Sequence, residues 1–190
     1  MNVKNLILLF ALGIGITLSS CNKDDDDVAN PENPNDNELI TTVQIVLTDT
    51  ANSSDQIKVS FSQMPAQRIA VTPYVETMQL KANSVYYAEV LLLDETKNPV
   101  DTISNEVREE GNEHQLFYKV EYADLTIDYN DADDNGVPIG LNTLFKTGET
   151  STGVLRITLK HQGDEKPKSG SGNELLGSTD VDVAFNVEIE

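Results

Sequence analysis

Cysteine is almost absent from this 190-residue chain, which contains a single one, Cys21. One cysteine cannot form a disulfide bond within the chain or build a site that needs several thiolates. There is no tryptophan and only 6% aromatic residues, so a large aromatic ligand groove is not expected. Basic residues are scarce too, with 13 Lys and Arg against 32 Asp and Glu. The net charge of -19 repels phosphates, so we expect no nucleic-acid partner.

Recognisable catalytic motifs are also missing from the sequence. No serine occupies a nucleophile elbow, and no glycine-rich phosphate loop follows a predicted strand. Carboxylates are abundant, but their spacing alone cannot pair them into a general acid and a general base. We therefore expect no catalytic residues and a protein that is not an enzyme. The acidic charge favours solubility on a crowded cell surface, and it also attracts cations.

Residues 1–21 have the pattern of a secretory signal. A short leading segment with Lys4 precedes an apolar stretch over residues 6–18, and small residues follow up to Cys21. The apolar stretch is too short, and too interrupted by glycine, for a membrane span of about 20 residues. We expect residues 1–20 to be a signal peptide that is removed before Cys21.

The residues around the expected cleavage point carry a family resemblance. Leu18-Ser19-Ser20-Cys21 resembles the lipobox of bacterial lipoproteins. This resemblance implies that the Cys21 thiol receives a diacylglycerol and that the new amino terminus is a further acylation site, typically for palmitate. Several acyl chains, each contributing about 0.8 kcal/mol per buried methylene, would anchor the protein durably in a lipid bilayer.

An acidic run of four aspartates at residues 24–27 follows the cysteine. It resembles the export signal of surface-exposed Bacteroidota lipoproteins, which implies an outer-membrane protein that faces the cell exterior. A solvated tether, extended by repulsion between like charges, is a compatible alternative. Pro31 and Pro34 then discourage helix in a segment without apolar periodicity. We expect residues 21–38 to form the acylated cysteine and a disordered linker.

From residue 39 onward, apolar and polar residues alternate in short runs, which is typical of half-buried β-strands. The alternating apolar positions are Val43, Ile45 and Leu47; Ile57, Val59 and Phe61; Leu116, Tyr118 and Val120; Leu125, Ile127 and Tyr129; Leu155, Ile157 and Leu159; and Val181, Val183, Phe185, Val187 and Ile189. Residues 84–93 are nearly continuously apolar, which predicts a central strand covered on both faces. Residues 104–111 predict one short helix that begins at an N-cap serine, Ser104.

These runs predict an all-β fold for a single domain over residues 39–190. Seven to eight strands separated by turn residues indicate an antiparallel, immunoglobulin-like β-sandwich with at most one short helix. A parallel α/β sheet is not expected, because the long helices that it requires are missing.

The segment DYNDADDNGVPIGL, residues 128–141, is a first candidate for binding a cation. Asp131, Asp133 and Asn135 are spaced two residues apart and precede Gly136, which resembles the first half of the calcium loops of EF-hand and dockerin-type proteins. An EF-hand loop that began at Asp131 would end in a bidentate glutamate, but this chain has Asn142 there. The alternative is a β-hairpin that turns at Asn135-Gly136 with solvated acids.

The two histidines are a second candidate, because His114 and His161 each end an apolar strand face. If the strands near residues 114, 124, 141 and 154 run alternately up and down, the first begins where the last ends. His114, His161 and the nearby Glu113, Asp164 or Glu165 would then form a zinc or copper site. The alternative is that each histidine caps the core or binds a backbone carbonyl.

Most of the mature chain is similar to a group of small Bacteroidota lipoproteins without an established activity, through the segments HQLFYKV, DADDNGVPIGL and VLRITLKH. Some are labelled with a type 1 periplasmic-binding fold, which this sequence contradicts because that fold is α/β. By analogy, the resemblance implies a TonB-dependent outer-membrane transporter as partner. Two functions remain open: a non-catalytic binding or interaction module at the cell surface, and a cation-binding accessory lipoprotein of such a transporter, with calcium, zinc or copper as the cation.

Overall fold

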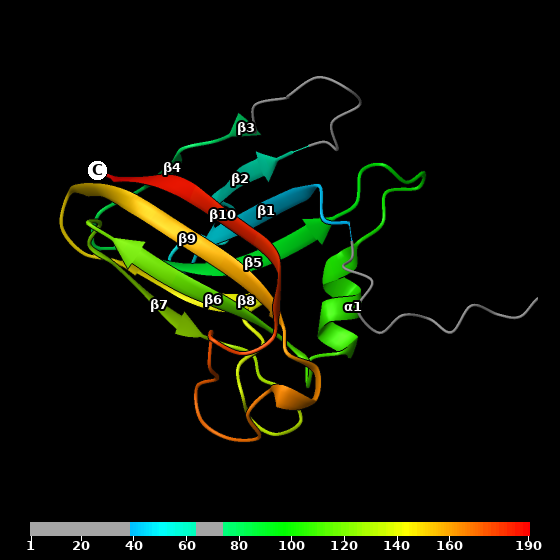
Figure 1. Ribbon diagram of the computed structural model, residues 1–190. Coiled ribbons are helices and arrows are strands. Elements are labelled where there is room, and N and C mark those ends of the chain that lie inside the picture. The colour runs from blue at the N-terminus through cyan, green and yellow to red at the C-terminus, as the bar shows by residue number, and fades with distance from the viewer. Residues whose placement is uncertain (1–38, 64–73) are drawn as a thin grey trace, which may run out of the picture. The chain divides into compact units, whose positions relative to one another are not determined.

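The computed structural model describes residues 39–63 and 74–190, so the expected signal peptide, Cys21 and the tether lie outside the described residues. Figure 1 shows two stacked β-sheets with the helix α1 (Ile103–Glu109) at one end. The strands are β1 (Thr42–Asp49), β2 (Gln56–Ser62), β3 (Tyr74–Val75), β4 (Met78–Leu80), β5 (Val85–Leu93), β6 (His114–Glu121), β7 (Leu125–Tyr129), β8 (Asn142–Thr147), β9 (Ser151–His161) and β10 (Ser178–Ile189). The prediction of an all-β sandwich is confirmed.

One sheet has six strands in the order β3-β2-β1-β5-β8-β7, and the other has four in the order β4-β10-β9-β6. The predicted alternation places every second side chain of a strand between the sheets. Ile45 of β1, for example, lies opposite Val59 of β2 and Val90 of β5, and all three are buried. Since burial of apolar surface is the main driving force of folding, this shared core holds the two sheets together.

Three details of the fold differ from the sequence prediction. There are more strands than predicted, because the short β3 and β4 lie at the edges of the two sheets, and β4 pairs with β10 in parallel. The strand β5 is central within its sheet but buries only one face, and Tyr87 on the other face is 39% exposed. The helix begins at Ile103, one residue before Ser104, which is buried inside it instead of capping it.

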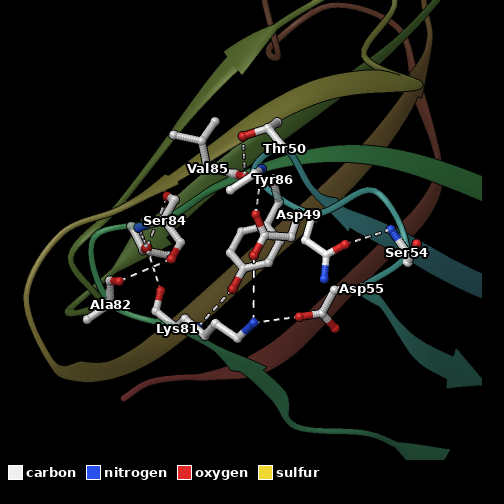
Figure 2. A network of polar contacts seen from close by, with 12 residues as sticks. Asp49, Thr50, Ser54, Asp55, Lys81, Ala82, Ser84, Val85 and Tyr86 are labelled. Atoms are coloured by element: carbon white, nitrogen blue, oxygen red, sulfur yellow. Dashed lines mark hydrogen bonds and ion pairs between the residues drawn. The ribbon is translucent and has the colours of Figure 1, made fainter.

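A polar network joins two turns where β1 ends and β5 begins. Figure 2 shows the Lys81 ammonium beside the carboxylates of Asp49 and Asp55, and the nearest Asp49 oxygen is 3.6 Å away. The backbone N–H of Lys81 donates a hydrogen bond to the hydroxyl of the buried Tyr86. These contacts connect the β1–β2 turn to the β4–β5 turn, so we assign the network a structural role.

The opposite ends of β1 and β5 lie beside α1, and the chain then enters β6 at His114. This end also contains the end of β9 and the start of β10 (Figure 1). A 3-10 helix, η1 (Gly163–Glu165), opens the connection between those two strands. Among the described residues, no helix is long and apolar enough to cross a membrane.

Candidate metal centre

The antiparallel pairing of β6 with β9 places His114 directly opposite His161. The two imidazole rings are stacked, with centroids 4.6 Å apart and planes inclined by 22°. His114 is buried and His161 is partly buried. The strand ends therefore meet as the up-and-down order predicted, although β6 and β9 belong to the sheet that does not contain β7 and β8.

Asp180 of β10 completes a group of three that the sequence analysis did not predict. One ligand atom from each of His114, His161 and Asp180 lies within 4.8 Å of the other two. The pairing of β10 with β9 shifts register between Thr179 and Val181, so Asp180 is the extra residue of a β-bulge. Strict alternation would place Asp180 on the outer face, like Asp182, and the bulge redirects it toward the histidines.

Hydrogen bonding defines how His114 can act as a ligand. Its Nδ1 lies 3.3 Å from the backbone carbonyl oxygen of Glu110, just after the end of α1. When Nδ1–H donates to this carbonyl, Nε2 keeps its lone pair, which is the arrangement of most metal-binding histidines. Burial lowers the pKa of His114, so the imidazole is neutral near pH 7. The sequence analysis predicted a contact between histidine and a backbone carbonyl as an alternative to metal binding. In the structure this contact is compatible with metal binding.

Burial of the Asp180 carboxylate destabilises the protein when no metal ion is bound. Its Oδ1 is buried and has no hydrogen-bond partner among residues 39–63 and 74–190. Burial raises the pKa of Asp180, and the two nearby histidines oppose this shift. Buried polar atoms in proteins nearly always form hydrogen bonds. A buried carboxylate oxygen that lies beside two imidazoles and forms none therefore needs an explanation. A bound cation would provide one.

The other acidic residues proposed from the sequence near the histidines are arranged differently. Glu113 Oε2 lies 3.4 Å from His161 Nε2. Asp164 and Glu165 lie on η1 and are exposed. None of Glu113, Asp164 and Glu165 belongs to the group of three. Glu113, Asn112, Asn135, Gly163, Asp164, Lys166 and Lys168 line a polar cavity of about 280 Å³ at this end of the domain.

The loop between β7 and β8 contains the calcium candidates, and its carboxylates already have partners. Asp131 accepts hydrogen bonds from the backbone N–H groups of Gly140 and Asn142, at 2.7 and 2.9 Å. Asp133 Oδ1 accepts from Asn135 and Val137, at 2.8 and 2.9 Å. The predicted tight hairpin at Asn135-Gly136 is not what joins the strands, because residues 130–141 form a long loop between β7 and β8. A turn over residues 133–136 lies within this loop, and Gly136 adopts a φ of 78°.

A lysine ammonium lies where the loop would need a metal cation. The buried Nζ of Lys166 is 2.9 Å from Asp133 Oδ2, and it donates to the carbonyl oxygens of Gly111 and Pro138. Burial alone would raise the pKa of Asp133, but Lys166 and the two backbone N–H groups hold it below its usual value. The geometry of this loop therefore does not support the calcium hypothesis for Asp131, Asp133 and Asn135.

Two imidazoles and one carboxylate are ligands that suit zinc and copper better than calcium, which prefers six to eight oxygen atoms. Ligand atoms about 2.1 Å from a tetrahedral ion are about 3.4 Å from one another. The three side chains would therefore have to move together by roughly 1 Å, within the reach of small rotamer adjustments. Three protein ligands also leave a coordination position open to a further group.

Comparisons of the chain with protein-family models, with curated protein sequences and with solved structures found no match.

Proposed function

We propose that this protein binds a divalent transition-metal ion, zinc or copper, at His114, His161 and Asp180. The observation that carries the proposal is the buried Oδ1 of Asp180, which has no partner within the described part of the chain and belongs to a carboxylate that a β-bulge directs toward two stacked imidazoles. Desolvation of such an atom costs about 1–3 kcal/mol, which a bound cation would offset.

The proposal specifies the wider function expected from the sequence, a non-catalytic binding module at the cell surface. The lipobox-like residues before Cys21 support a lipid anchor, and the acidic run at residues 24–27 supports display on the outer face of the outer membrane. A metal ion bound by an exposed module of this kind is cargo, and a TonB-dependent transporter is the partner that the resemblance suggests.

Zinc and copper titration of the mature lipoprotein in detergent tests the proposal, with calcium as the comparison ion. We expect one equivalent of zinc or copper to bind at low micromolar concentration or tighter, and no calcium to bind under the same conditions. Failure of both zinc and copper to bind would refute the proposal.

Asp180→Asn has a matched control on the same strand. Asp182 has the same charge but points outward, where it pairs with the exposed Arg156. We expect Asp180→Asn to weaken zinc binding at least about tenfold and Asp182→Asn to leave it unchanged. Equal affinities in the two variants would exclude Asp180 as a ligand.

A further inference from the structure

The backbone of Glu113 is held firmly against the end of β9. Its N–H donates to the carbonyl oxygen of Glu110 at 2.8 Å, and its carbonyl oxygen accepts from the N–H of Gln162 at 2.6 Å. Gly163 N–H also donates to this carbonyl, at 3.3 Å. The main chain of Glu113 is thus fixed between α1 and the residues that follow His161, and its side chain extends from a defined point.

The distance from Glu113 Oε2 to His161 Nε2, 3.4 Å, is informative. A charge-assisted hydrogen bond between a ring nitrogen and a carboxylate is typically about 2.7–2.9 Å long. Two ligand atoms about 2.1 Å from one tetrahedral ion are instead about 3.4 Å apart. The separation of Glu113 from His161 therefore matches that of two ligands of one metal ion better than that of a strong hydrogen bond. Glu113 lies outside the group formed by His114, His161 and Asp180, so its side chain would have to turn toward the other two ligands to bind the same ion.

Exposure distinguishes Glu113 from the other members of the site. Its side chain is 52% exposed, against 19% for His161 and 4% for His114. Glu113 also lines the polar cavity of about 280 Å³, which His114, His161 and Asp180 do not line. A flexible glutamate in this position can leave an ion without disturbing the core.

We infer that Glu113 is the fourth ligand of the metal centre, and that it is the ligand most easily displaced when the ion exchanges with solvent. The inference rests on the proposed function. His114, His161 and Asp180 hold the ion from the protein side, while Glu113 closes the open position and is the ligand displaced on exchange. The centre is then an exchangeable cargo site, not a permanent structural one.

Glu109 provides a control for testing Glu113. It is an exposed glutamate in the last turn of α1 and is not a member of the group formed by His114, His161 and Asp180. Glu113→Gln and Glu109→Gln therefore remove the same charge, but only the first changes a residue beside His161.

The experiment compares the mature wild-type lipoprotein in detergent with the two variants, by zinc competition, by the rate of zinc release to a chelator and by the visible spectrum of bound Co²⁺. We expect Glu113→Gln to weaken zinc binding about tenfold, to speed release and to change the spectrum from that of a four-coordinate nitrogen and oxygen site. Glu109→Gln should match the wild type in all three measurements.

The outcomes separate this inference from the proposed function. Absence of zinc and copper binding by the wild type would refute the proposed function itself. If the wild type binds and Glu113→Gln matches it in affinity, release rate and spectrum, only the role of Glu113 is refuted. An unchanged cobalt spectrum would overturn the inference even if affinity fell, because the carboxylate would then act through His161 and not as a ligand.

Discussion

At the scale of single residues, Asp180 shows a conflict between stability and binding. A buried carboxylate oxygen without a partner weakens the metal-free fold, and the raised pKa of Asp180 reflects the same desolvation. We predict that Asp180→Asn stabilises the metal-free protein by about 1 kcal/mol, because it removes a buried charge. Urea unfolding at neutral pH, with Asp182→Asn as control, measures this change. A loss of stability in Asp180→Asn would mean that the carboxylate has a structural partner.

Tyr129 makes a residue-level prediction about alkaline pH. Its hydroxyl donates to the carbonyl oxygen of Leu116 at 2.9 Å, and burial raises its pKa to about 12. Above pH 10 the unfolded chain loses this proton while the folded protein keeps it, so stability falls as the pH rises. The decline for one such group is about 1.4 kcal/mol per pH unit and ends near the folded-state pKa.

Denaturant unfolding between pH 9 and pH 12 tests this behaviour, with Tyr129→Phe as the variant. The free energy of unfolding of the wild type should decrease across this range. The decrease should be shallower in Tyr129→Phe, although burial also raises the pKa of Tyr118, which remains. Parallel curves for the two proteins would show that Tyr129 ionises equally in the folded and unfolded states.

At the scale of elements, Lys166 connects three loops at the end of the domain that contains the candidate centre. It lies in the β9–β10 connection, and its ammonium binds Gly111 after α1 together with Asp133 and Pro138 in the β7–β8 loop. The side chains of Lys166 and Asp133 are each only 1% exposed. This contact therefore stabilises the loops that flank His114, His161 and Asp180.

We predict that Lys166→Met lowers the free energy of unfolding by about 3 kcal/mol, because it leaves Asp133 as a buried carboxylate without its counter-charge. Lys168→Met is the matched control, since Lys168 is exposed and only two residues away. Its effect should stay within about 0.5 kcal/mol. Chemical denaturation of both variants gives the comparison, and a similar midpoint for the two would contradict the assigned role of Lys166.

At the scale of the whole molecule, anchoring and display are separate properties that different residues are proposed to provide. We predict that Cys21→Ser releases the protein from the membrane fraction, because it removes the thiol to which the proposed acyl chains would attach. Replacing the four aspartates at residues 24–27 with asparagine should retain the protein in the membrane but reduce its exposure to protease on intact cells. Cell fractionation and protease shaving measure the two effects. Membrane retention of Cys21→Ser would contradict the anchor.

Much of the fold could be predicted because apolar residues at every second position of a strand lie on the same face, and that face is the buried one. The same parity assigned His114 and His161 to inward positions, and the order of the strands brought their ends together. Parity failed for Asp180, because one inserted residue in a ladder reverses which face a side chain occupies. In the Asp131 loop, the spacing of Asp131, Asp133 and Asn135 could not show that the cation present is Lys166, which is distant in sequence from these residues.

The sequence by itself determined the alternating strands, the all-β class of the domain and the two histidines as candidate ligands, since these depend on local patterns. Only the tertiary structure decided which carboxylate joins the histidines and which acids are already neutralised. Both are matters of distance between segments, which depend on a bulge in β10 and on a lysine buried among three loops. Such features arise from pairing and packing across the chain, and no local period encodes them.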